Sequence, residues 1–104
     1  MALTREFKHT VMARVQQDPE FRSELIREAT NAFLNDDVET GKALLRDYLN
    51  ATELLAEVAK ELDLNVKSIR RMLGPSGNPT LKNFTRILKA CSQAEHIKLE
   101  VCSH

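Results

Sequence analysis

Apolar residues recur at intervals of three or four over most of the chain, and this spacing places them on one face of an α-helix. Five or six helices are therefore expected. Their apolar faces are expected to consist of Phe7, Val11 and Val15; Phe21, Leu25, Ala29 and Phe33; Val38, Leu44, Leu45, Tyr48 and Leu49; Leu55, Val58, Ala59 and Leu62; Ile69, Met72 and Leu73; and Leu81, Phe84, Ile87, Leu88 and Cys91. The pattern predicts an all-α fold.

Residues that cap helix N-termini precede each of these segments. An oxygen-bearing side chain at this position accepts a hydrogen bond from a backbone N–H that the first helical turn leaves free. The expected caps are Thr4, Asp18, Asp36 or Asp37, Thr52, Asn65 and Thr80. Pro19 follows the second of them at the first helical position, where Pro is favoured. The second helix is expected to stop near Asn35 and the third near Asn50.

The C-terminal residues break the helical period. The run His96-Ile97-Lys98-Leu99-Glu100-Val101 alternates polar and apolar residues, which is the period of a β-strand with one buried face. Because a single strand leaves its backbone groups unpaired, this one is expected to pair with another chain, with the partner or with its own copy across a dimer axis, and the alternative is a frayed tail. The expected organisation is a helical extension at 1–36, a helical domain at 37–94 and a C-terminal strand or tail at 95–104.

The stretch AEVAKELDLNVKSIRRML, residues 56–73, has the features of two helices that cross at a tight turn. Such a pair needs a small residue in the first helix, a turn that accepts an unusual backbone angle, and an apolar anchor in the second helix. Ala59, Asp63 and Ile69 occupy these three positions. Glycine is commonest in such a turn, but Asp tolerates the left-handed backbone region better than most residues. The stretch therefore predicts a helix-turn-helix.

Charge is segregated along the chain, although the formal net charge is zero. Residues 64–94 contain six Lys and Arg residues and no Asp or Glu, whereas residues 1–63 contain thirteen acidic residues and eight basic ones. Such asymmetry favours a polyanionic partner for the basic segment alone. The alternative is a basic face that is merely solvated.

The order LLRDYLNAT followed by KSIRRMLGPSGNPTLKN, with GNPT after the second helix, carries a family resemblance. Residues 38–92 resemble the lambda-repressor and Cro-like helix-turn-helix domains. More narrowly, these motifs and the start MALTREFKHTVMARVQQDPEFR are similar to the antidote or antitoxin-type regulators of bacterial toxin–antitoxin modules. The resemblance implies a transcriptional regulator that binds double-stranded operator DNA as a homodimer and represses its own operon. In many members of that group a small, ribosome-dependent RNA-cleaving toxin is also captured.

The resemblance places the DNA-reading positions on the outer face of residues 65–73. Lys67 and Arg70 are expected at base edges, since Lys and Arg donate hydrogen bonds to guanine O6 and N7. Arg71 is expected at bases or phosphate. The other expected DNA contacts are Thr52, Asn65, Val66, Ser68, Ser76, Asn78, Thr80 and Lys82. For the cap residues among them the alternative is capping alone, and Val66 is either exposed or in contact with a thymine methyl.

Neither a catalytic site nor a metal site is expected. His9, His96 and His104 have no partner residues at ligand spacing. The acidic residues at 36–39 lie at an expected helix start, where they serve as cap and dipole partners, and no nucleophile accompanies them. The chain is thus expected to be no enzyme and to need no cofactor. The alternative function is a helical protein-interaction module whose basic face docks an acidic partner.

Location and redox state are also predicted from the sequence. No apolar run approaches the ~20 residues that a membrane span requires, and the start of the chain has no apolar signal-peptide core. A cytoplasmic protein without membrane contact is expected. In that compartment Cys91 and Cys102 are expected to be a core thiol and a surface thiol rather than a disulfide. If there is a toxin, it is expected to bind the N-terminal part of the chain rather than the basic helix, since residues 1–63 carry the acidic excess and toxins of the resembled group are usually basic.

Overall fold

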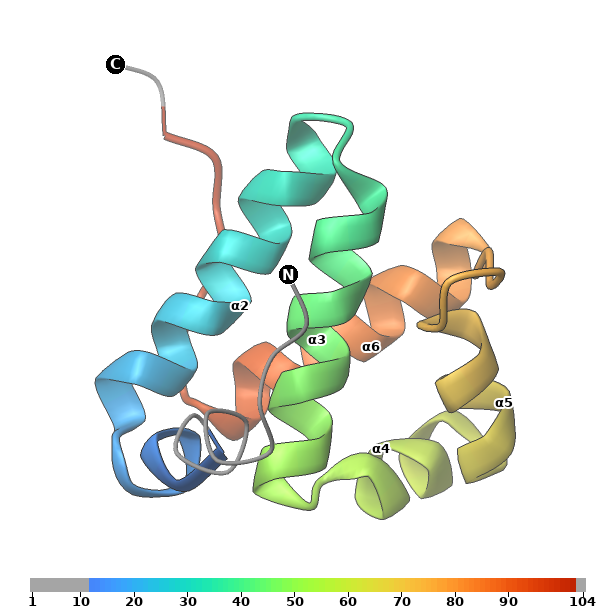
Figure 1. The fold of residues 1–104 in the computed structure, drawn as a ribbon, viewed down its shortest axis with the longest axis horizontal. Coiled ribbons are helices and arrows are strands. Elements are labelled where there is room, and N and C mark those ends of the chain that lie inside the picture. The colour runs from blue at the N-terminus through green and yellow to red at the C-terminus, as the bar shows by residue number, and fades with distance from the viewer. Residues whose placement is uncertain (1–11, 103–104) are drawn as a thin grey trace.

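The computed structural model describes residues 12–102, and the ordered elements within them are helices. A helical segment at 12–17 precedes α2 (Pro19–Leu34), α3 (Val38–Thr52), α4 (Leu55–Leu62), α5 (Val66–Met72) and α6 (Leu81–Ala94) (Figure 1). The predicted all-α class is confirmed. The expected start of the first helix at Thr4 lies outside the described residues.

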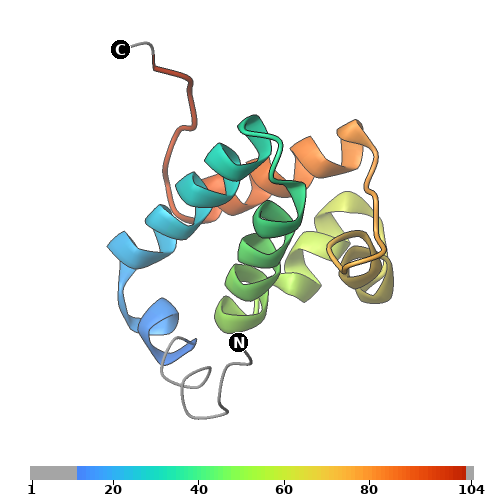
Figure 2. The ribbon, with the colours of Figure 1, turned by 45° about the horizontal axis from the view of Figure 1, so that its top comes forward.

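The helices are arranged around one main core. α2 and α3 form an antiparallel pair joined by a short turn, and α6 crosses behind α3 (Figure 1). α4 and α5 lie on the far side of α3 from α2, as the turned view also shows (Figure 2). Each of the five helices from α2 to α6 contributes buried side chains to this core, including Ile26, Leu45, Val58, Ile69 and Ile87. α2 therefore packs into the same core as the segment at 37–94.

Four helices are followed by a non-glycine residue in the left-handed backbone region, and three of these helix ends share one hydrogen-bond pattern. Asp36, Asp63 and His96 have φ angles of 64°, 56° and 56°. At each of them the following N–H donates to a carbonyl five residues back, and the residue's own N–H donates to a carbonyl three residues back. This is the Schellman arrangement, which satisfies carbonyls that the end of a helix leaves free. The left-handed conformation expected of Asp63 is confirmed.

Most of the predicted caps are confirmed. The side chains of Asp18, Asp37, Asn65 and Thr80 accept hydrogen bonds from backbone N–H groups in the first turns of α2, α3, α5 and α6. The prediction that Thr52 caps the fourth helix is wrong, because α3 continues to this residue and its hydroxyl donates to the Tyr48 carbonyl at 2.7 Å.

Two apolar positions face solvent contrary to the predicted faces. Leu81 is 79% exposed and Val38 is 41% exposed. Both are the first residues of their helices, α6 and α3, so they project beyond the packed part of the helix. In contrast, Gly41 of α3 is buried. The Phe33 ring of α2 lies so close to it that an added Cβ would be 2.8 Å from the ring. This glycine allows α2 and α3 to approach each other closely.

The strand expected in the C-terminal segment is not formed in the single chain. Residues 97–102 have neither helical nor strand structure, and residues 103–104 lie outside the described range. Ile97 and Leu99 nevertheless pack partly against the main core, while the Lys98 and Glu100 side chains are 84% and 64% exposed. Over residues 97–100 the alternation thus separates a partly covered face from an exposed face, whereas Val101 is exposed. The described chain supplies no second strand for the backbone to pair with.

The two thiols differ in burial and are therefore expected to differ in reactivity. Cys91 is fully buried and Cys102 is exposed, as expected from the sequence. Burial, with a smaller contribution from the nearby Glu95 charge, raises the pKa of the Cys91 thiol from 9.0 to about 12. A thiol reagent at neutral pH is expected to label Cys102 alone in the native protein and both thiols after unfolding. Rapid labelling of Cys91 in the native state would contradict this burial.

Candidate nucleic-acid interface

The contact between α4 and α5 holds α5 in a fixed position. Ala59 of α4 is 3% exposed, and Ile69 and Leu73 are 0% and 3% exposed. All three belong to the main core cluster, in which Met72 also packs partly. Between the two helices Asp63 adopts the left-handed backbone conformation, which turns the chain from α4 into α5 within a few residues. One face of this short helix is therefore fixed by the core, and the other is left to solvent.

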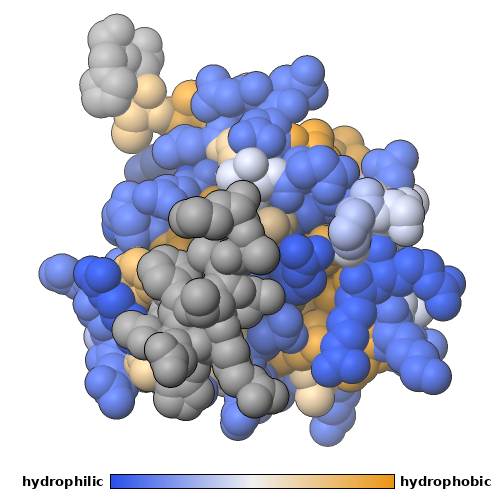
Figure 3. All heavy atoms as spheres, in the orientation of Figure 1, coloured by the Kyte–Doolittle hydropathy of each residue, from blue (hydrophilic) through white to orange (hydrophobic). Residues whose placement is uncertain are grey.

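The outer face of α5 is basic. Lys67, Arg70 and Arg71 are all exposed, and their spacing of three and four residues puts them on one side of the helix. None of them forms an ion pair or hydrogen bond with another side chain in the described part of the chain. Hydrophilic side chains cover the right-hand side of Figure 3, where α5 lies in Figure 1. These cations are available to a partner.

A buried lysine from α3 holds the loop that follows α5. Lys42 is 1% exposed, and its Nζ donates to the carbonyl oxygens of Gly74 at 3.0 Å and Gly77 at 2.8 Å. The same ammonium forms an ion pair with Glu39 at 3.0 Å. Hydrogen bonds from a charged donor are stronger than those between neutral groups. Lys42 therefore fixes the loop at 74–79 against α3.

A second cation from α3 holds the end of α5. Arg46 donates from Nη1 to the Leu73 carbonyl at 2.9 Å. Together with Lys42 it places positive charge at the C-terminus of α5, where the helix dipole is negative. The loop also needs Gly77, because a Cβ there would overlap the Arg71 carbonyl oxygen. Three hydrogen bonds from α3, two from Lys42 and one from Arg46, thus help to fix the position of a helix of only seven residues.

Neither Lys42 nor Arg46 was predicted as a functional residue. A signal for Lys42 exists in the sequence, because it precedes Leu45 by three residues and so lies on the buried face of α3. A lysine on an apolar helix face requires a polar partner. The partner, a loop more than thirty residues away, carries no corresponding signal.

The remaining predicted contacts lie near α5, except one. Asn65 and Ser68 belong to the first turn of α5, and Val66 packs partly against the core. Ser76, Asn78, Thr80 and Lys82, in the following loop and at the start of α6, are exposed. The N-cap oxygens of Asn65 and Thr80 are already used, at 2.8 Å and 3.1 Å, by backbone N–H groups. Capping of these two is therefore established, and DNA contact stays a prediction.

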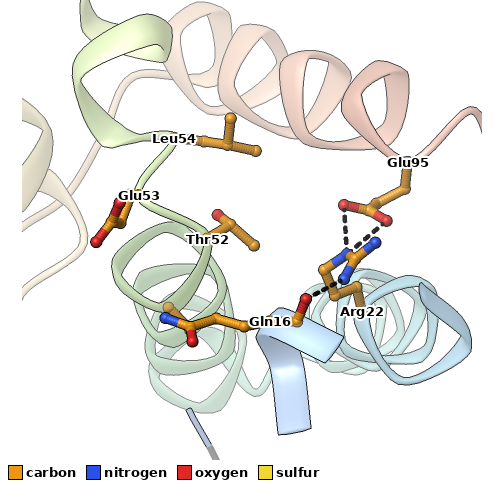
Figure 4. A pocket seen from close by; sticks show the side chains of 7 residues that line it. Gln16, Arg22, Thr52, Glu53, Leu54 and Glu95 are labelled. Carbon is orange, nitrogen blue, oxygen red and sulfur yellow. Dashed lines mark hydrogen bonds and ion pairs between the residues drawn. The ribbon is translucent and has the colours of Figure 1, made fainter. Parts of the chain in front are cut away.

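Thr52 lies in a different place from the one expected. It is the last residue of α3, so its N–H belongs to that helix and is not free at the start of α4. Its side chain lines a cavity of about 600 Å³ with Gln16, Arg22, Leu54 and Glu95 (Figure 4). The predicted phosphate contact from a helix N-terminus therefore loses its structural basis at this residue.

The polar groups of this cavity form a structural network. Arg22 donates to the two Glu95 carboxylate oxygens at 2.9 and 3.1 Å and to the Gln16 carbonyl at 3.1 Å (Figure 4). The Tyr48 hydroxyl donates to Glu95 at 2.6 Å. Burial and then the hydrogen bond to this carboxylate raise the pKa of Tyr48. The network ties α2 and α3 to the end of α6.

Other kinds of site receive no support from the arrangement of side chains. The residues that line the cavity include no Cys, Ser or His, the Thr52 hydroxyl there donates to the Tyr48 carbonyl, and Glu95 is paired with Arg22. Within residues 12–102 no three His, Cys, Asp or Glu side chains are grouped closely enough to hold a metal ion. No helix in the same range combines the length and apolar character of a membrane span.

Comparison of the chain with protein-family profiles, with curated protein sequences and with solved structures finds no match.

Proposed function

We propose that the protein is a sequence-specific DNA-binding transcriptional regulator in which α4 and α5 form a helix-turn-helix and α5 enters the major groove. The observation that carries the proposal is the outer face of α5, where Lys67, Arg70 and Arg71 are exposed and unpaired within the described residues. Lys67 lies in the N-terminal half of α5, with which reading helices mainly contact base edges, and Arg70 and Arg71 extend the basic face into its last turn. Ile69 packs in the core, and Lys42 and Arg46 donate hydrogen bonds to carbonyls at the C-terminal end of α5 and in the following loop. These contacts give α5 the rigidity that base readout needs.

Phosphate contacts are assigned to the segment after α5. Ser76, Asn78 and Lys82 are exposed there, and polar and basic side chains beside a reading helix fix its register on the duplex. Because one reading helix covers few base pairs, the regulator acts as a homodimer on two half-sites about one helical turn, ~34 Å, or a multiple of it apart.

The regulator is further proposed to be the antitoxin of a toxin–antitoxin module that represses its own operon in the cytoplasm. This step rests on the motif resemblance and on the charge asymmetry of the chain. α2 exposes Glu20, Glu24 and Glu28, so the acidic half of the protein offers a surface to a small basic toxin. That surface belongs to a different helix from the basic face of α5, and both partners can therefore bind at once.

Binding to the DNA segment upstream of its own gene tests the function. Affinity for this fragment is expected to exceed that for a shuffled fragment of equal length by about 10³-fold or more. It is also expected to fall with salt at a logarithmic slope of about −0.9 per phosphate neutralised. Titration by fluorescence anisotropy over several salt concentrations measures both quantities. Equal, weak binding to both fragments would contradict sequence-specific recognition and favour an acidic protein as the partner of the basic face.

A further inference from the structure

The C-terminal tail presents an unpaired backbone edge. The N–H of Ile97 donates to the Ser92 carbonyl at 3.0 Å, and beyond it residues 98–102 form no backbone–backbone hydrogen bond within the described chain. An extended segment with free donors and acceptors is a template for another strand. Its alternating sequence is that of a strand with one covered face.

The exposed side of the tail is self-complementary in charge. Lys98 and Glu100 lie on the same face, 4.0 Å apart, and are the charged residues of the segment 97–102. On the opposite face Ile97 and Leu99 pack partly against the core, and Val101 is 81% exposed. In an antiparallel pair of tails, the residues of the second copy run in the opposite order. When the two-fold axis passes through Leu99, every positive charge therefore lies opposite a negative one.

We propose that two copies of the chain pair through residues 97–101 as antiparallel strands, with the two-fold axis at Leu99. Lys98 then lies opposite Glu100 of the partner subunit and Glu100 opposite Lys98 of the partner subunit. On the other face Ile97 lies opposite Val101 of the partner subunit, and the two Leu99 side chains meet at the axis. Two charge pairs and three apolar pairs stabilise the ribbon, since directly opposite side chains are the stabilising unit of a sheet. The proposal deepens the homodimer of the proposed regulator.

Other registers lack this complementarity. An axis at Lys98 sets the two Lys98 ammonium groups against each other, and an axis at Glu100 does the same with two carboxylates. Like charges directly opposite each other destabilise a strand pair. A shift of the pairing by one residue, with the axis between two positions, sets apolar side chains opposite charged ones. Parallel pairing in register again sets each charge against its equal.

The surroundings of the tail agree with a second copy as the occupant. A groove of about 350 Å³ lies between the tail and α6, lined among others by Leu88, Ile97 and Leu99. The exposed Val101 of the partner subunit lies next to this groove in the proposed pairing, because it is opposite Ile97. The tail and α5 lie at opposite sides of the molecule in both views (Figures 1 and 2). Pairing therefore leaves the basic face of α5 uncovered.

A charge exchange between the two exposed positions tests the pairing. Lys98→Glu leaves two acidic residues in each tail and Glu100→Lys leaves two basic ones, so either variant alone sets like charges opposite each other. Each is expected to raise the dimer dissociation constant by about 10- to 100-fold at low ionic strength. An equimolar mixture of the two variants restores both opposite-charge pairs and is expected to form heterodimers about as tightly as the parent. Sedimentation or light scattering, without DNA, measures these associations.

A disulfide test fixes the register independently. In a Cys102→Ser background, Leu99→Cys is expected to form a covalent dimer on mild oxidation, since residues directly opposite lie within disulfide reach. Val101→Cys is the matched control. This position is more exposed in the single chain. In the proposed pairing, however, the two copies of residue 101 lie about four residues apart along the ribbon, beyond disulfide reach, so little cross-linking is expected.

Three results would overturn the pairing: a monomeric parent at tens of micromolar, single charge variants that associate like the parent, or a mixture that stays dissociated. Stronger cross-linking of the Val101→Cys variant would likewise reject the register. Because none of these measurements uses DNA, their failure leaves the proposed DNA binding to its own test with the upstream fragment. Failure of that test in turn leaves the dimer contact standing.

Discussion

Replacing Lys42 with Met is expected to lower the free energy of unfolding by about 2 to 3 kcal/mol. The substitution keeps the length and apolar volume of the side chain and removes the ammonium that donates to the Gly74 and Gly77 carbonyls. Each charge-assisted hydrogen bond contributes about 1.5 to 3 kcal/mol. Relief from burying a charge offsets part of the loss.

Thermal unfolding followed by circular dichroism measures the effect. A loss of this size corresponds to a midpoint roughly 10 to 20 °C lower for a domain of about one hundred residues. Lys60→Met is the matched control, because Lys60 is an exposed residue of α4. Its effect is expected to stay within about 0.5 kcal/mol. Equal midpoints for the two variants would mean that Lys42 does not stabilise the loop.

The same substitution connects stability with recognition. Without Lys42 the loop at 74–79 loses its hydrogen-bond donors from α3. Of the hydrogen bonds described above from α3 to this region, the one from Arg46 to the end of α5 then remains. α5 is then expected to be less well fixed, so the operator affinity of the folded variant falls although no DNA-facing residue has changed. A hydrogen-exchange measurement is expected to show loss of protection in α5 and the loop before the other helices.

The double variant Lys67→Ala, Arg70→Ala is expected to weaken operator binding by about 30-fold or more while leaving stability unchanged. Each base contact contributes about 1 to 3 kcal/mol of affinity. Both side chains are exposed and contribute nothing to the core, so the unfolding free energy is expected to change by no more than about 0.5 kcal/mol. Binding and folding are thereby measured separately on one protein.

A variant that removes a cation from another helix distinguishes recognition from general attraction. Arg27→Ala also removes an exposed cation, but from α2, where the guanidinium pairs with Glu24. It is expected to leave operator affinity nearly unchanged. Among the α5 residues, loss of a guanine contact by Arg70 relaxes the preference at one base pair, whereas loss of a phosphate contact, as expected for Lys82, weakens all sequences alike. Operator binding like the parent by the double variant would rule out α5 as the reading helix.

The helices themselves were predictable because their determinants are local. Caps such as Asp18, Asn65 and Thr80 act on backbone groups two or three residues away, and the apolar period is read within a few turns. The inward residues of α4 and the anchor Ile69 of α5 followed from the same spacing. The basic outer face of α5 was also predictable. Once the spacing identifies the apolar side of a short helix, the residues on its other side are expected to be exposed.

Thr52 shows where local information failed. Its residue type suits an N-cap, but α3 continues to this position and ends at Glu53, whose φ of 61° is left-handed. The start of α4 has no side-chain cap at all. Its burial in the core through Leu55, Val58 and Ala59 stabilises the helix without one, since packing contributes more to helix stability in proteins than local signals do.

Contacts between distant segments were decided only by the tertiary structure. Lys42 meets Gly74 and Gly77, and Arg22 meets Glu95 across 73 residues, because packing of the helices brings them within hydrogen-bond distance. The sequence alone determined which residues prefer helix and which face of each helix is apolar, since these depend on neighbours one or two turns away. It could not determine which buried polar group meets which carbonyl, because that depends on the relative placement of whole helices.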